Sequence, residues 1–409
     1  MKRALRLLVD KYFDLLFILF FAFAFFLPRY IPIAIALMFI GLLFPKHRKT
    51  RSELSFKFKG NEVLYAFVAL YLLHVTFLLN SENIHFGLKD LEMKLVFILF
   101  PIFFFFSPNS ITKKVFKYFS YVALINAIWL LFIFLFLPNQ TEAGKILNSD
   151  IHRNYLAVYF TLAAVYFLLR SLTKKIALEL LYCIVLIATS ILTQSKIGLI
   201  ISVLSVLLIL IYTFFVLKNY KNGIVALISL SLFSLVVYIT IPQAFNRVSN
   251  MVNVIKTKEN VPFLDQDEKT GYIKPVETNK ARMQVWESSV GLITQNPLGY
   301  GTGDVSDVLV AENKKNGYLY VAAQRLNSHN QFFTTTIALS FLGGVLLLSI
   351  FILTLFRNKI STQHSWFKFL ILFSIFLFAL TESCFEVQAG IIIFTLLIIA
   401  LSRKNEILT

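Results

Sequence analysis

Apolar residues fill most of this chain in long runs that shorter polar connections separate. A transmembrane helix needs about 20 predominantly apolar residues. Twelve runs approach or exceed the length needed to cross a bilayer: 12–28, 30–45, 61–80, 93–107, 115–137, 153–170, 176–194, 197–217, 222–242, 331–356, 366–382 and 386–402. The pattern predicts an all-α polytopic membrane protein with about 12 transmembrane helices.

Prolines and run order refine the first part of the pattern. Pro28 separates the first two runs into a hairpin, and Pro101 is expected to kink the fourth span. The first apolar run is followed directly by another, which is not the pattern of a cleavable signal peptide.

One long polar segment interrupts the apolar pattern and divides the chain into three parts. We expect nine transmembrane helices in residues 1–242, an extracytoplasmic loop with short helices and catalytic elements in 243–330, and three more transmembrane helices in 331–409. Residues 256–280 of this loop lack clear periodicity, which leaves acceptor recognition and a flexible connection both open.

The last part of the polar segment begins with a helical pattern at Arg282. Asn296 and Pro297 end it, because a residue before proline is driven out of the α region. The helix is expected to lie on an apolar surface, since its apolar residues recur at spacings of three and four: Met283, Trp286, Val290 and Ile293.

A glycine-rich turn, NPLGYGTGD, follows this helix. It matches neither common glycine-rich phosphate-binding pattern, and Asp304 at the next helix start would compete with an anion for the free amides. A tight turn is therefore favoured over a phosphate cradle, which stays the alternative.

Composition agrees with a membrane protein. Of the 409 residues 57% are hydrophobic, 44 are phenylalanine, and only 15% are charged. The two cysteines, Cys183 and Cys384, lie in or beside apolar runs, so we expect small buried side chains rather than a disulfide or a metal site.

The net charge of +17 follows the predicted topology. Of the 39 lysines and arginines, 23 lie at the termini and in alternate connections, against 6 in the opposite short connections. The positive-inside rule then places both termini in the cytoplasm and residues 243–330 outside. That outer segment is nearly neutral, with 10 basic and 9 acidic residues, so nucleic-acid binding is not indicated.

Several outward-facing cations are candidates for chemistry. Lys196 lies in the short connection LTQSKIGL, where its ammonium either extends to lipid headgroups or contacts a lipid-linked phosphate. Asp150, His152 and Arg153 cluster before the sixth span. They either cap that span, or His152 and Arg153 line the same cavity as Lys196.

His329 is the most informative single residue, because it lies where the chain re-enters apolar sequence, beside Asn330. Arg325 precedes it by four residues and would share a helical face with it. Together with Arg282 and Lys196, His329 becomes a candidate for acid–base work. Glu382 and Glu386, beyond the eleventh span, are interpreted as solvated turn residues.

The histidines, cysteines and carboxylates do not show metal-ligand spacing, and we expect no metal and no cofactor.

Three motifs resemble the O-antigen ligase and polymerase family of bacterial membrane glycosyltransferases. They are TQSKIG around Lys196, R-x-x-x-W at Arg282 and Trp286 followed by NPLGYGTGD, and SHN ending at Asn330 before a span with Gly343 and Gly344. The number of spans and the long outer loop also agree with the family.

The resemblance implies an inverting, metal-independent transferase of the GT-C type in the bacterial cytoplasmic membrane, with its active site outside the cytoplasm. The donor would be a glycan on a polyprenyl diphosphate, and the acceptor a hydroxyl of a lipid or glycan. Arg282 and Lys196, with Arg153, would bind the diphosphate, while His329 would orient or deprotonate the acceptor. The family commonly has arginine at the position of Lys196, and a lysine lacks the two-pronged phosphate contact.

Two other functions stay open at this point. One is a transporter or flippase of lipid-linked glycans, although the sequence lacks an obvious inverted repeat. The other is a structural partner in an envelope assembly. For the transferase, we expect Lys196, Arg282 and His329 to converge on one place.

Overall fold

The computed structural model describes residues 2–43, 54, 58–136, 151–174, 176–240, 276, 278–357, 361–403 and 407–408. Every regular element in these ranges is helical, which agrees with the predicted all-α fold. Most of the stretch 256–280 and Asp150 lie outside the described residues.

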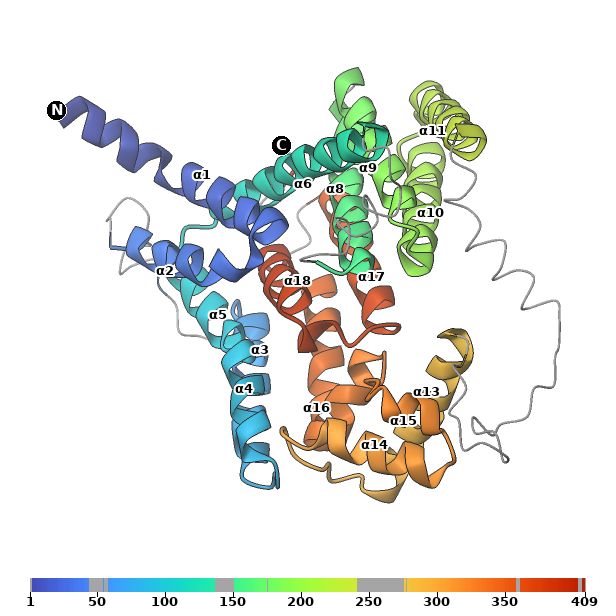
Figure 1. Ribbon diagram of the computed structural model, residues 1–409. Coiled ribbons are helices and arrows are strands. Elements are labelled where there is room, and N and C mark those ends of the chain that lie inside the picture. The colour runs from blue at the N-terminus through green and yellow to red at the C-terminus, as the bar shows by residue number, and fades with distance from the viewer. Residues whose placement is uncertain are drawn as a thin grey trace.

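A helix lies on each of the twelve predicted apolar runs (Figure 1). Their bounds are α1 (Lys2–Phe26), α2 (Ile31–Gly41), α3 (Glu62–Leu78), α5 (Val96–Phe106), α6 (Ile111–Phe136), α8 (Arg153–Lys174), α9 (Ala177–Leu192), α10 (Lys196–Ile211) with the π-turn η4 (Tyr212–Val216), α11 (Tyr220–Thr240), α16 (Gln331–Phe356), α17 (Thr362–Ala379) and α18 (Gln388–Leu401).

Counting only the residues that the structure describes, five of these helices are long and apolar enough to cross a bilayer by length and composition: α6, α8, α10 with η4, α16 and α17. The protein is therefore an all-helical chain with several membrane-spanning candidates, and the number twelve stays a prediction. The predicted hairpin turn is the short 3-10 helix η1 (Pro28–Tyr30), and Pro101 lies inside α5.

Aromatic packing builds the core of the bundle. In α18 every residue from Gly390 to Leu401 is buried, and in α8 the buried residues include Tyr155, Tyr159 and Phe160. The Tyr159 hydroxyl donates to the carbonyl oxygen of Ala389, so these two helices are also tied by a hydrogen bond. Both cysteines are free and buried, as expected.

Four further α-helices of the described residues correspond to none of the twelve apolar runs. α13 (Thr278–Gln295), α14 (Val305–Lys315) and α15 (Leu319–Ala323) fall in the long polar segment, and α4 (Ile84–Lys94) follows α3. Figure 1 shows α4 and the α13–α15 group at the same end of the bundle. Sequence reasoning did not predict α4, which is amphipathic and too short and polar to resemble a span.

The glycine-rich turn fixes α4 against this group. Asp304, the residue before α14 as predicted, accepts hydrogen bonds from the amides of Glu82 and Asn83 at 2.9 and 2.8 Å. A Cβ on Gly303 would lie 2.2 Å from the Asn83 carbonyl oxygen, so only glycine allows this approach.

The same turn fills a break in α16. Leu339 and Ser340 leave helical geometry there, and Ser340 has a φ of 68°. The freed carbonyl oxygens of Ile337 and Ala338 accept from the amides of Tyr300 and Gly301 at 2.8 and 3.1 Å. Irregular backbone at membrane depth is tolerated where protein satisfies it. The amides of this turn serve the protein itself, which favours the tight-turn interpretation over a phosphate cradle.

Candidate active site

Glu382 is the centre of a cluster of side chains from four parts of the chain. Its Oε1 accepts from Arg282 Nη2 at 2.5 Å and from Asn154 Nδ2 at 2.8 Å. Its Oε2 lies 3.0 Å from His329 Nδ1. We call Asn154, Arg282, His329 and Glu382 the Glu382 cluster.

Helix ends bring these residues together. Asn154 belongs to the first turn of α8, and His329 directly precedes Asn330, the N-cap of α16. Glu382 lies just beyond the end of α17. Arg282 is supplied by α13, which packs beside α16. Because all three bundle helices present their ends on the same side, the cluster forms at one end of the bundle.

His329 is held in a sharp turn. Its φ of 43° is in the left-handed region, and its amide donates to Asn327 Oδ1 at 2.9 Å. Ser328, which is fully buried, is bonded through its hydroxyl to Thr334 and Ser383. The hydroxyl contacts tie the histidine turn to the segment that carries Glu382.

The Lys196 motif contacts the same cluster through neighbours. Ser195 caps α10 by accepting from the Gly198 amide at 3.1 Å, and its hydroxyl donates to Asn154 Oδ1 at 2.8 Å. Lys196 Nζ reaches Asn279 Oδ1 at 3.5 Å, on α13 one turn before Arg282. A Cβ on Gly198 would lie 2.2 Å from the Ala157 Cβ, so this glycine lets α10 pack closely on α8.

His152 and Arg153 lie beside the cluster at the start of α8. The His152 ring accepts weakly from the Asn154 amide at 3.4 Å. Loss of hydration lowers the pKa of His152; Glu382 acts against this, while Arg153, His329 and Arg282 add to it. His152 is therefore within electrostatic reach of the whole cluster, while its carbonyl also accepts from the Tyr155 amide in the first turn of α8.

Opposing effects act on the Glu382 carboxyl. Burial raises its pKa, but the His329 hydrogen bond and the Arg282 charge outweigh burial, so the pKa lies below the ordinary value for glutamate. The carboxylate is ionised at neutral pH and can only accept hydrogen bonds, so Nδ1–H of His329 is the donor in their contact. In the neutral imidazole this leaves Nε2 as the basic nitrogen.

The interpretation of the two glutamates as solvated turn residues is wrong. Glu382 is only 8% exposed. Glu386 ends the 3-10 helix η5 (Cys384–Glu386) and pairs with the buried Lys94, Nζ to Oε2, at 2.6 Å. A glutamate after an apolar run gives no sequence sign of partners that lie over 50 or 100 residues away, so both were missed.

The expectation that Arg325 and His329 share a helical face is also wrong. α15 ends at Ala323, and Arg325 has a φ of 47°, so no helix connects the two residues. The Arg325 guanidinium instead contacts Asp307 on α14 at 2.5 Å and is largely exposed. Asn330 is an N-cap, and its side chain accepts from the amides of Phe332 and Phe333.

Trp286 lies one turn beyond Arg282 and contacts Phe333 of α16 edge to face, with ring centroids 6.3 Å apart. The predicted apolar stripe packs into the protein only in part: Met283 is 69% exposed and Val290 47% exposed, whereas Trp286 contacts Phe333 and Ile293 packs against buried residues. The buried face of α13 is another one, which includes Val285 and Leu292.

Among the described residues, no group of three histidines, cysteines or carboxylates is placed to hold a metal ion. The cluster combines a carboxylate-held imidazole with nearby cations at one end of an all-helical membrane bundle. It can accept a proton at His329 and attract an anion at Arg282 and Lys196.

Part of the chain matches a known protein family. Residues 181–348 match the family model described as O-antigen ligase, which assigns this region to the O-antigen ligase family and confirms the predicted resemblance. The match supports a role in surface-polysaccharide assembly with a glycosyltransferase-like ligase activity. A search of curated proteins found no match.

The matched region contains Lys196, Arg282 and His329, the three cationic candidates. Asn154 and Glu382 lie outside it. The Glu382 cluster therefore joins two residues of the matched region, Arg282 and His329, to residues before and after it.

Proposed function

We propose that this protein transfers a glycan from a polyprenyl diphosphate to a hydroxyl acceptor, as an O-antigen ligase or polymerase. The observation that carries the proposal is the contact of Glu382 with both His329 and Arg282. In this proposal His329 is a base and Arg282 a neighbouring cation, and both would favour transfer from a diphosphate.

His329 is the base in this scheme. Glu382 accepts from Nδ1–H, and Nε2 takes the proton of the acceptor hydroxyl. The acceptor oxygen forms a bond to the anomeric carbon while the bond from that carbon to the diphosphate oxygen breaks. The released polyprenyl diphosphate keeps the electron pair, and attack from the opposite face inverts the anomeric configuration. No metal takes part in this scheme.

Arg282 and Lys196 stabilise the leaving group. Negative charge grows on the diphosphate as the glycosidic bond breaks, and fixed cations favour that change. A guanidinium has five N–H donors, so Arg282 can hold Glu382 through Nη2 and present other donors to phosphate. Lys196 supplies a point charge without the two-pronged contact of arginine. Arg153 and His152 border the same place.

Orientation follows from the charge pattern of the connections. With basic connections and both termini in the cytoplasm, the Glu382 cluster faces outward. No nucleotide sugar is supplied there, so a lipid-linked donor fits the location. A flippase needs no base at the cluster, and no contact in the described residues favours it over transfer.

The test is transfer of lipid-linked oligosaccharide to acceptor in purified membranes. Arg282→Ala and His329→Ala are each expected to reduce the rate by about 10²-fold or more. Arg325→Ala, which removes an exposed cation of the same outer group, is the matched control and should keep wild-type rates. Wild-type transfer by both cluster variants would remove the proposed site. Alternating inward and outward labelling of cysteine probes along α8–α10 would favour the flippase.

A further inference from the structure

Three cations, two of them buried and one partly exposed, lie at the end of the bundle opposite the Glu382 cluster. Arg357 follows α16, Lys368 lies near the start of α17, and Arg403 follows α18. Lys368 is 1% exposed and Arg403 6% exposed. Lys368 Nζ donates to the carbonyl oxygen of Arg357, so their charges lie close together. Arg403 follows α18, which packs against α16 and α17, and burial and the charge of Arg357 lower its pKa to about 10.

Among the described residues, this basic cluster, Arg357, Lys368 and Arg403, has more positive than negative charge around it. Within the described residues, Glu62 is the one carboxylate in ion-pair distance, 2.7 Å from Arg357 Nη1. Arg403 is held by a neutral group, the Oδ1 of Asn109, at 2.8 Å. Buried cations of one sign are unfavourable unless an anion joins them.

Beside the basic cluster, the buried ring of His364 has no hydrogen-bond partner among the described residues. His364 lies one turn before Lys368 on α17 and is 2% exposed. In the part of the chain that the structure describes, neither of its ring nitrogens has a hydrogen-bond partner. A buried imidazole without partners indicates that a polar group belongs beside it.

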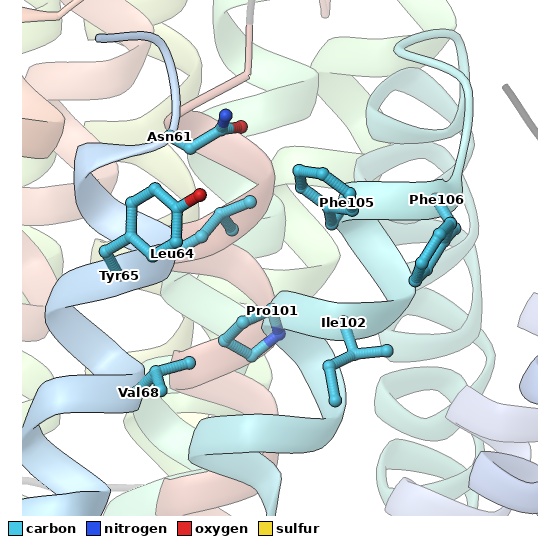
Figure 2. Close-up of a pocket in the computed structure, with 8 residues that line it drawn as sticks. All are labelled: Asn61, Leu64, Tyr65, Val68, Pro101, Ile102, Phe105 and Phe106. Atoms are coloured by element: carbon cyan, nitrogen blue, oxygen red, sulfur yellow. The ribbon is translucent and has the colours of Figure 1, made fainter. Parts of the chain in front are cut away.

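An apolar groove lies near Arg357 of this basic cluster. It lies between α3 and α5, has a volume of about 200 Å³, and is lined almost entirely by apolar atoms. Figure 2 shows Asn61 and the Tyr65 hydroxyl toward one end of the groove, with Val68 and Ile102 farther along it. The groove therefore has a polar end and an apolar body.

Arg357 lies beside the polar end of the groove. The Arg357 guanidinium pairs with Glu62 and lies 3.6 Å from the Cβ position of Gly60, the residues on either side of Asn61. Arg403 is bonded to Asn109, three residues after the groove residue Phe106. The basic cluster therefore adjoins the groove through Arg357, beside Asn61.

We propose that this place binds an anionic phospholipid, with its phosphate among Arg357, Lys368 and Arg403 and an acyl chain in the α3–α5 groove. Guanidinium and ammonium groups recognise phosphate through charge-assisted hydrogen bonds. A free phosphate ion would leave the groove without an occupant, and a zwitterionic lipid would not balance the excess positive charge.

The first test compares ligands on the purified full-length chain in detergent. Phosphatidylglycerol is expected to raise the unfolding temperature and to stay bound in native mass spectrometry. Phosphatidylcholine with the same acyl chains, and inorganic phosphate, should do neither. Equal effects of the two lipids, or an equal effect of inorganic phosphate, overturn the proposal. Neither readout requires transfer, so this result is independent of the proposed function.

The second test uses variants of the two halves of the site. Lys368→Met removes one cation and Ile102→Trp fills the groove, and each is expected to weaken phosphatidylglycerol binding by about fivefold or more. Ile125→Trp, on the exposed face of α6 and 58% exposed, is the control and should bind as wild type. Lys368→Met relieves like-charge repulsion, so it should fold; if it does not, Ile102→Trp decides. Unchanged binding in Ile102→Trp overturns the proposal.

Discussion

Two lysines, each only 1% exposed, lie at opposite ends of the bundle in opposite electrostatic surroundings. Lys94 lies between two carboxylates, 2.5 Å from Asp90 Oδ1 and 2.6 Å from Glu386 Oε2. Lys368 donates to a carbonyl oxygen next to the charge of Arg357 and, among the described residues, has no carboxylate in ion-pair distance. Equal burial therefore says little about a lysine's role, whereas the balance of charge around it distinguishes a structural pair from a site that lacks an anion.

The ion pairs of Lys94 with Asp90 and Glu386 also support the Glu382 cluster. Glu386 accepts from Gln331 Nε2 at 2.9 Å, and Gln331 Oε1 accepts from the Phe385 amide at 2.6 Å. Gln331 follows His329 by two residues, and Glu386 follows Glu382 by four. The Lys94 pair thus fixes the two chain segments whose side chains meet at the cluster.

The largest expected effect comes from removing the carboxylate of Glu382. Glu382→Ala removes the group that orients His329 and pairs with Arg282, and we expect transfer to fall by about 10²- to 10⁴-fold. The rate in membranes, normalised to protein abundance, is the measurement. Glu312→Ala is the control. Glu312 is a largely buried glutamate on α14 that contacts Gln295 and Lys315. This variant should retain transfer. A Glu382→Ala enzyme at wild-type rate contradicts the role given to the cluster.

The next effect compares the two lysines directly. Lys94→Met leaves Asp90 and Glu386 buried without their cation, so the free energy of unfolding should fall by about 3–5 kcal/mol. Lys368→Met removes one of several like charges and should change stability by less than about 1 kcal/mol or increase it. Both are measured by denaturant unfolding of the lipid-free protein. Equal losses of unfolding free energy in the two variants would contradict the proposed difference between the two lysines.

The smallest effect concerns pH at the Glu382 end. Because the folded pKa of Glu382 is lowered, its contribution to stability is complete above the unfolded value of about 4.3 and is lost as pH falls through the folded pKa. Unfolding of the wild type should therefore become easier on acidification, and Glu382→Gln should respond less steeply. The difference between the two curves isolates this group from other carboxylates. Parallel curves contradict the assignment.

The fold was largely predictable because lipid imposes a simple rule on sequence. Apolar runs marked all twelve helices to within a few residues at most ends, although α1 begins ten residues earlier than its run. α4 was missed because its pattern is that of an ordinary amphipathic helix. The break at Ser340 was missed because it depends on Tyr300 and Gly301, which arrive from a distant turn.

The site was predictable only in part. Lys196, Arg282 and His329 stood out as cations near apolar boundaries, and the structure brings Arg282 and His329 to one carboxylate. That carboxylate, Glu382, gave no local sign of its partners. Arg325 misled because a spacing of four residues has meaning only inside a helix, and the chain leaves helical geometry at that point. The roles of all these residues stay predictions.

The hydrogen bonds of Glu382 and Glu386 limit which chain segments could be exchanged between this protein and a relative. Residues 181–348 carry the family match, yet the groups that hold them in place include Lys94, Asn154 and Glu382, which lie before and after that region. A chimera that exchanges only the matched region would bring in foreign neighbours for these side chains. Grafting the specificity of one relative onto another therefore requires co-transfer of the helix ends at α4, α8 and α17.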